Sequence, residues 1–158
     1  MKKIHFLLLF HLIVGILTII FFNGTGDAGD SVYHYLFAKY APNHPELYFD
    51  HWAKPFFVLT ASPFSQLGFV GVKIMNLLLV NGTLWLTYLV TKKLNIQHAW
   101  LVTLLLIFSP LYFILTFSGL TEPLFAFLLL LSFYFFFQKK LFWSCLIISF
   151  LPYVRSEG

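Results

Sequence analysis

Long stretches without a formally charged residue dominate this chain and restrict what it can fold into. Five of them are residues 4–26, 74–91, 94–121, 123–138 and 141–154. An α-helix needs about 20 apolar residues to cross the hydrocarbon core of a bilayer, and about 17 is the working minimum. The first three stretches reach this length, the fourth reaches it by recruiting Leu120 and Thr121, and the fifth is short. We therefore expect an all-α, polytopic membrane protein with four to five transmembrane helices.

The composition excludes other classes of protein. The chain is 59% hydrophobic and 10% charged, whereas a soluble domain carries about 25% charged residues. Its net charge of +4 comes from short lysine pairs beside apolar runs. This arrangement is typical of membrane topology signals and not of a nucleic-acid-binding patch. The single cysteine, Cys145, excludes a disulfide framework.

The charged residues predict an orientation. Three lysine doublets, at positions 2–3, 92–93 and 139–140, flank alternate ends of successive stretches and are expected on the cytoplasmic side. All acidic residues then face outward, namely Asp27, Asp30, Glu46, Asp50, Glu122 and Glu157. We expect a multi-pass protein of the cell (inner) membrane with a cytoplasmic N-terminus. Residues 1–158 would form one transmembrane domain, with residues 23–65 as its first extracytoplasmic loop.

This outward loop is expected to contain an interfacial helix. Asp30 or Ser31 can cap its start, and Pro42 follows its end. Apolar residues recur between them at helical spacing and predict a helix lying on the membrane surface: Val32, Tyr33, Leu36, Phe37 and Tyr40.

Two acids of this loop are the candidate catalytic residues. A carboxylate at a partly dehydrated membrane face has a raised pKa and can act as a general base, so Asp27 and Asp30 could take a proton from a substrate. The alternative is that both are solvated loop acids. They could also gather with His34 around a metal ion, although this spacing alone is a weak metal signal.

Further candidates lie beside the other apolar stretches. His51 and Lys54 flank a membrane entrance, where Lys54 could pair with a lipid phosphate; the alternative is an ordinary aromatic-belt loop. Glu122 precedes Pro123 and would sit at an outer helix start, as a cap or as part of a site. Arg155 and Glu157 place further charge at an outer helix end, and several ionisable groups on one face favour a functional site.

Four stretches of the chain carry recognisable motifs, namely residues 29–35 (GDSVYHY), 51–57 (HWAKPFF), 108–123 and 151–158 (LPYVRSEG). Together they resemble the membrane glycosyltransferases of the C superfamily (GT-C), in the branch of protein O-mannosyltransferases and aminoarabinose transferases. Residues 29–35 (GDSVYHY) resemble the acidic motif of that family, and residues 51–57 (HWAKPFF) its Lys-Pro-Pro-Leu stretch. Residues 108–123 are similar to its paired-helix segment with an acid at the outer turn. Residues 151–158 (LPYVRSEG) resemble its Arg-x-Glu helix end. The stretches occur in the family's order.

The resemblance implies transfer of a sugar from a polyprenyl-phosphate donor to a lipid, glycan or protein acceptor on the extracytoplasmic side. Asp30, or alternatively Asp27, would deprotonate the acceptor hydroxyl. Lys54 and Arg155 would stabilise the leaving phosphate, and His51, Glu122 and Glu157 would complete the donor site. The resemblance requires no cofactor and leaves a divalent metal open. Besides the donor and acceptor, the expected partners are membrane lipids and not nucleic acid.

The chain departs from the family pattern at two positions and in length. Ser31 follows Asp30 where the family often has Glu, and Phe56 replaces the second Pro of the Lys-Pro-Pro stretch. Members of the family are longer, so the resemblance implies an N-terminal fragment that is inactive alone. Two other functions remain open, a flippase or transporter of a lipid-linked precursor and a non-catalytic membrane subunit. A transporter would need polar or broken helices at the midplane of the membrane. The sequence of residues 94–138 shows few signs of either.

Overall fold

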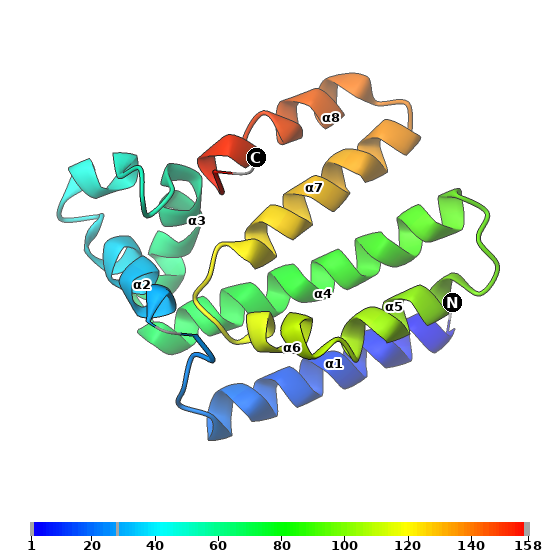
Figure 1. Ribbon diagram of the computed structural model, residues 1–158, viewed down its shortest axis with the longest axis horizontal. Coiled ribbons are helices and arrows are strands. Elements are labelled where there is room, and N and C mark those ends of the chain that lie inside the picture. Colours follow the sequence, from blue (N-terminus) through cyan, green and yellow to red (C-terminus); the bar gives the residue numbers. More distant parts are fainter. Residues whose placement is uncertain (1, 28, 157–158) are drawn as a thin grey trace.

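The computed structural model describes residues 2–27 and 29–156, and these residues form helices and turns with no β-strand. Figure 1 shows the elements in chain order. They are α1 (Lys2–Phe21), α2 (Asp30–Tyr40), η1 (Pro45–Phe49), α3 (Pro55–Ser65), α4 (Phe69–Lys93), α5 (Ala99–Ile107), α6 (Pro110–Thr116), α7 (Glu122–Phe137), α8 (Leu141–Ile148) and η2 (Leu151–Tyr153), where η marks a short 3-10 helix. The all-α class expected from the sequence is confirmed.

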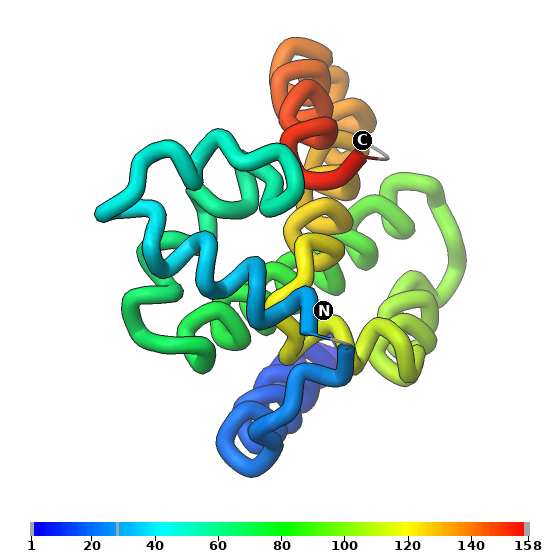
Figure 2. Tube along the Cα trace, turned by 60° about the vertical axis from the view of Figure 1, so that its left-hand side comes forward, coloured from blue at the N-terminus to red at the C-terminus, as the bar shows by residue number. Residues whose placement is uncertain are grey.

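The longer helices run back and forth around α4, which contacts α1, α5 and α7. In Figures 1 and 2, α1 and α8 lie at opposite edges of this bundle, and α2, η1 and α3 cross one of its ends. The three lysine doublets lie at the same end of the bundle. They are at the start of α1, at the end of α4 and between α7 and α8. The acid-bearing segments, before and within α2–η1 and at the start of α7, lie at the other end.

Two of the helices, α1 and α4, are long and apolar enough to cross a membrane. A third span results if α5 and α6 are counted as one bent unit, and α7 and α8 are shorter apolar helices. The first helix ends at Phe21, several residues before the end of the charge-free stretch. Along α1, large apolar side chains are exposed, including Phe6 (68% exposed) and Phe21 (80% exposed), and an exposed apolar surface of this kind is typical of a contact surface.

Residues 94–121, which the sequence predicts as one span, do not form one continuous helix. The chain breaks between α5 and α6 at Phe108 and Ser109, and the two helix axes are bent by 72°. Pro110 begins α6, and proline has no N–H for the preceding turn and disfavours a helical residue before it. Pro110 is the sequence signal for this break. The length and apolarity of residues 94–121 nevertheless favoured a single span.

The expected helix after the first apolar stretch is confirmed, with its start at Asp30 and its end at Tyr40. Its cap differs from the expectation. Neither Asp30 nor Ser31 caps the helix; instead the Asp27 carboxylate accepts hydrogen bonds from the N–H groups of Gly29 (3.2 Å) and Ser31 (2.9 Å). Gly29 has a φ of 119°, a conformation that glycine adopts without strain.

The predicted apolar face of α2 faces the bundle only in part, because Phe37 packs on the buried cluster of Ala41, Ala53 and Val58. Val32, Tyr33 and Tyr40 are exposed, whereas the buried residues of the helix are Ser31, His34 and Ala38. This arrangement fits a helix that lies on an apolar surface with its outer face.

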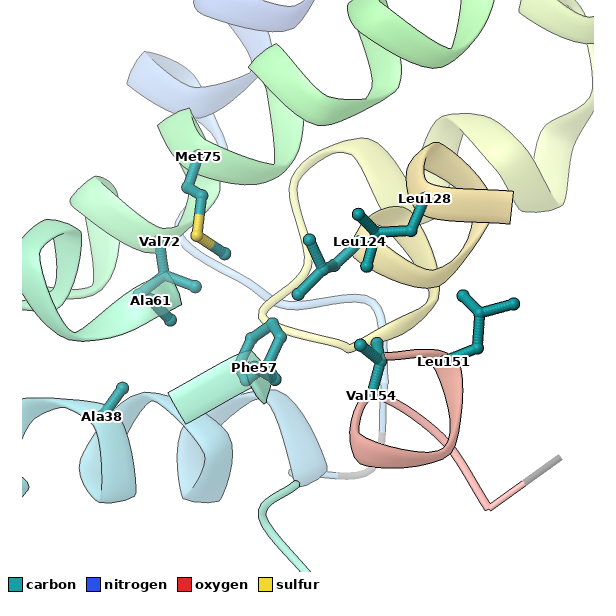
Figure 3. Packing of buried hydrophobic residues seen from close by; sticks show 9 residues of the cluster. All are labelled: Ala38, Phe57, Ala61, Val72, Met75, Leu124, Leu128, Leu151 and Val154. Atoms are coloured by element: carbon teal, nitrogen blue, oxygen red, sulfur yellow. The ribbon is translucent and has the colours of Figure 1, made fainter. Parts of the chain in front are cut away.

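One apolar cluster holds the end of the bundle together, as Figure 3 shows. It joins α2, α3, α4, α7 and the C-terminal segment through Ala38, Phe57, Ala61, Val72, Met75, Leu124, Leu128, Leu151 and Val154. Phe57 is fully buried at its centre, and burying such a side chain contributes about 1.5–3 kcal/mol. The cluster fixes the positions from which the polar residues of this end project.

A polar tether holds the turn between α6 and α7 against the bundle. The buried Asn76 amide on α4 donates hydrogen bonds to the carbonyl oxygens of Ser118 (2.7 Å) and Leu120 (3.2 Å). The Ser31 hydroxyl on α2 accepts a hydrogen bond from the Gly119 N–H (2.8 Å). A side chain at Gly119 would clash, because its Cβ would lie 2.6 Å from the Ser31 carbonyl oxygen. The turn is therefore fixed to both α2 and α4.

Replacing Asn76 by Ala should destabilise the protein by about 2–4 kcal/mol, since two hydrogen bonds are lost and two carbonyl groups are left without their donor. The measurement is thermal unfolding of the purified protein in detergent. Thr87→Ala serves as the control, because the Thr87 hydroxyl bonds only to the Thr83 carbonyl of its own helix and should change stability by under about 1 kcal/mol. Equal stability of the Asn76 and Thr87 variants would contradict the tether.

Candidate functional site

An open pocket of about 360 Å³ lies at the acid-bearing end. It is formed by the start of α2, the segment before α3, the α6–α7 turn and the C-terminal segment. Its lining is Asp30, His34, His51, Trp52, Lys54, Leu120, Thr121, Glu122, Arg155 and Ser156. The pocket thus brings together five residues predicted from the sequence, which come from four separate parts of the chain.

The acidic wall of the pocket is made by two helix starts. Asp30 is the first residue of α2 and Glu122 the first residue of α7, where the helix dipole favours a negative charge. The tether from Asn76 and Ser31 holds residues two to four positions before Glu122. It therefore brings the second carboxylate to the same pocket as the first.

Arg155 forms an ion pair with Glu122 through one guanidinium nitrogen. The two side chains are 27% and 36% exposed, so the pair contributes at most about 1 kcal/mol to stability. Its main effect is geometric. It connects the C-terminal segment to the start of α7 and turns both charges toward the pocket.

Lys54 supplies the second cation of the pocket. Its Nζ donates a hydrogen bond to the Ser156 hydroxyl at 2.8 Å, and no carboxylate in residues 2–27 and 29–156 pairs with it. Its backbone has a φ of 69°, which is unfavourable for a residue with a side chain, and such strain is concentrated at functional sites. The strained turn projects a charged amine whose partner is a neutral hydroxyl, so the amine can bind an anion.

His34 is a pocket residue that the sequence suggested only as a weak metal ligand. It is 7% exposed, and its ring stacks on Trp52 at a centroid distance of 4.7 Å. Its position four residues after Asp30 places both on one face of α2, and this spacing was the available signal. The Nδ1 atom has no hydrogen-bond partner among the described residues.

Burial lowers the pKa of His34 below its ordinary value of 6.5. The charges of Asp30, Glu122 and Asp27 and a hydrogen bond to the Ala53 backbone act in the opposite direction and are outweighed. The imidazole is therefore neutral at pH 7 and offers a lone pair beside the carboxylates.

The two remaining predicted site residues are Asp27 and Glu157. Asp27 lies outside its lining, and its carboxylate caps α2. Partial burial would raise the pKa of Asp27, but the hydrogen bonds from the Ser31 and Gly29 N–H groups, together with those to the Thr25 and Ser31 side chains, hold it below its ordinary value. Glu157 lies outside the described residues. Within the described part of the chain, no three His, Cys, Asp or Glu side chains gather as metal ligands, including Asp27, Asp30 and His34.

An apolar groove of about 660 Å³ lies beside the polar pocket, between η1–α3 and the C-terminal segment. Its lining is Pro45, Tyr48, Phe49, Pro55, Phe56, Leu59, Phe150 and Tyr153. A smaller cavity shares Phe49, Pro55 and Tyr153 with the groove and His51, Lys54 and Ser156 with the pocket. The polar pocket and the apolar groove are therefore neighbours linked through this smaller cavity, and Lys54 lines both the pocket and the smaller cavity.

No protein family, curated protein or solved structure matches this chain. The site must therefore be interpreted from its own chemistry. It offers two carboxylates, two cations and a neutral imidazole around a cavity that lies next to an apolar groove. Such a site can bind an amphiphile with an anionic head and an apolar tail, and can accept a proton from a molecule in the pocket.

Acidification should loosen this end of the protein through His34. Because the pKa of His34 is lower in the folded protein than in the unfolded chain, its stabilising contribution is complete above pH 6.5 and is lost as the pH falls below that value. Thermal unfolding between pH 7.5 and 5.5 should show a decline in stability that His34→Gln reduces. Replacing the exposed His98 by Gln should leave the decline unchanged. An identical decline in the wild type and in His34→Gln would contradict the assignment.

Proposed function

We propose that this protein is a polytopic membrane glycosyltransferase, or the N-terminal part of one. It would transfer a sugar from a polyprenyl-phosphate donor to an acceptor at the outer face of the cell membrane. The observation that carries the proposal is the position of the charged pocket next to the apolar groove, with a smaller cavity between them that Lys54 lines. A lipid-linked sugar has the same division into an anionic head and an apolar chain. The resemblance of four stretches to the GT-C superfamily supports the same function.

The membrane placement is part of this proposal. In it, α1, α4 and the bent α5–α6 unit cross the bilayer, and α7 with α8 form a fourth and a fifth crossing of short length. The separation of lysine doublets and acids to opposite ends of the bundle supports a cytoplasmic N-terminus, since lysines near membrane helices mark the cytoplasmic side. The exposed apolar faces of α1 and α2 would contact lipid, α2 at the interface.

In the proposed reaction, Asp30 removes the proton of the acceptor hydroxyl. The oxygen attacks the anomeric carbon as the bond to the lipid phosphate breaks, which inverts that centre. Lys54 stabilises the negative charge that grows on the departing phosphate. Arg155 is already paired with Glu122, so its part is to orient Glu122 and to add positive charge at longer range. Nearby carboxylates favour the positive charge that develops on the sugar.

The bent α5–α6 unit is the feature that a transporter was expected to need, and it keeps a flippase as the second candidate. A cavity of about 260 Å³ adjoins the bend, but His11 and Ser109 are the polar residues of its lining, and the remainder is apolar. A translocated sugar would need more hydrogen-bonding groups along its path. The glycosyltransferase therefore remains the preferred function.

Asp30→Asn in the complete protein should reduce sugar transfer by about 100-fold or more, because a general base contributes about 10²–10⁴-fold. The assay incubates membranes containing the protein with a labelled polyprenyl-phosphate sugar and follows the label into the acceptor fraction. Glu46→Gln is the matched control: Glu46 is an exposed acid of the same loop that pairs with His44 at 3.4 Å, outside the pocket. Undiminished transfer by Asp30→Asn at normal protein levels would defeat the base assignment.

A further variant separates donor binding from catalysis. Lys54→Gln should raise the concentration of donor needed for half-maximal transfer, because the amine would bind the donor phosphate. If neither the wild type nor any variant transfers sugar, while labelled donor moves between the leaflets of vesicles that contain the protein, the flippase is the correct function.

A further inference from the structure

A second charged pocket lies at the opposite end of the bundle, where α1 begins. It has a volume of about 430 Å³ and is lined by Lys2, Lys3, Phe6, Leu7 and Trp100. These residues come from the first two turns of α1 and from the second residue of α5, and the two helices contact each other. From the sequence we expect this lysine doublet to set topology, and the proposed reaction does not use it.

The described part of the chain supplies no carboxylate counter-ion to the charges in this pocket. Lys3 Nζ lies 4.7 Å from the centroid of the Trp100 ring, and this cation–π contact holds the amine beside the indole. No lysine forms a salt bridge with a carboxylate within residues 2–27 and 29–156. The acids of these residues belong to the segments at the other end of the bundle. The two amines are therefore available to an external anion.

The contact line between α1 and the bent α5–α6 unit, called the seam below, also borders an apolar cavity further along α1. This is the cavity of about 260 Å³ at the α5–α6 bend, lined on one side by Phe10, His11 and Val14 of α1. Phe6, Phe10 and Val14 follow each other at four-residue spacing, so they share one face of α1. Residue 107 of α5 completes the far wall of the cavity, seven residues after Trp100. Charged pocket and apolar cavity thus follow one line along α1 and α5.

The distance between the charged pocket and the apolar cavity fits the length of a lipid acyl chain. Lys3 and His11 are eight residues apart, and a rise of 1.5 Å per residue separates them by about 12 Å along the helix axis. Half of the hydrocarbon core of a bilayer measures about 15 Å. An acyl chain that starts at the lysines therefore reaches the cavity within its own leaflet.

We propose that the seam between α1 and α5–α6 binds one anionic glycerophospholipid, with its phosphate at Lys2 and Lys3 and one acyl chain in the cavity at the bend. Trp100 lies at the level of the headgroup, where indole rings are favoured. The inference uses the membrane placement of the proposed function and is independent of sugar transfer. Basic pockets between membrane helices on the cytoplasmic side suit anionic headgroups. Inorganic phosphate alone would leave the apolar cavity unused.

The test uses Trp100 as the reporter. In the complete protein, Trp52, Trp85 and Trp143 are replaced by Phe, and the protein is reconstituted in bilayers with brominated phosphatidylglycerol or brominated phosphatidylcholine at equal mole fraction. Bromine quenches indole fluorescence at contact, so the anionic lipid should quench Trp100 more strongly. Lys2→Gln with Lys3→Gln should weaken the preference by roughly thirtyfold, since each lysine near an anionic lipid contributes about fivefold.

A matched control is offered by the third lysine doublet. Lys139→Gln with Lys140→Gln removes the same charge at the same end of the bundle, at the α7–α8 turn, and these lysines do not line the pocket. This variant should keep the preference of Trp100 for the anionic lipid. Filling the cavity by Val14→Phe should weaken binding of phosphatidylglycerol without a change in charge.

Native mass spectrometry of the unsubstituted protein in detergent provides a second measurement that does not depend on the tryptophan variants. One phosphatidylglycerol should remain bound, and the Lys2, Lys3 double variant should lose it. Equal quenching by the two lipids, equal loss in the two lysine double variants, or displacement of the lipid by millimolar inorganic phosphate would each overturn the proposal. Failure of sugar transfer would leave these results unaffected, so the two proposals fail separately.

Discussion

The arrangement of the acid-bearing end depends on the two hydrogen bonds from Asn76 to the α6–α7 turn. This turn follows a bent, apolar unit and begins α7, so without a fixed position Glu122 would have no defined place relative to Asp30. Asn76 is fully buried on α4, the helix around which the others pack. In an apolar environment an unpaired amide or carbonyl is costly, so the tether specifies one position of the turn. Ser31 adds a second contact from α2.

The site combines charge with local apolar packing. The cluster centred on Phe57 holds α2, α3, α4, α7 and the C-terminal segment together, and the charged residues project from the surface above it. The pair of Arg155 and Glu122 then closes one wall. The amine of Lys54 bonds to Ser156, the residue that follows Arg155, and Lys54 also lines the smaller cavity that borders the apolar groove. A cavity that suits a charged head therefore lies next to a groove that suits an apolar chain.

Sequence patterns predicted the parts of this structure that depend on local chemistry. The helical class, the limits of α2 and the separation of the lysine doublets from the acids follow from apolar length, proline positions and charge spacing. The break at Ser109 was missed because the length of the apolar stretch was given more weight than Pro110. The role of Asp27 as a cap was missed because the sequence alone does not show which carboxylate reaches the N–H groups of Gly29 and Ser31.

The candidate site was predicted as a set of residues but not as a geometry. Five residues chosen for their charge and outward position line one pocket. The stacking of His34 on Trp52 and the position of the groove next to the pocket could not be predicted, because they depend on how η1, α3 and the C-terminal segment pack together. The pairing of Arg155 with Glu122 is a similar case, since it joins residues that no local pattern relates.

The central claim is that charged groups from separate parts of the chain meet at the outer face of a membrane bundle. Single cysteines can test this directly in a variant with Cys145→Ser, at positions 30, 51 and 156 for the pocket and at positions 95 and 139 for the opposite end. A membrane-impermeant maleimide applied to intact cells should label the first three and should label the last two only after the membrane is opened. Labelling of positions 30 and 95 from the same side would contradict the account.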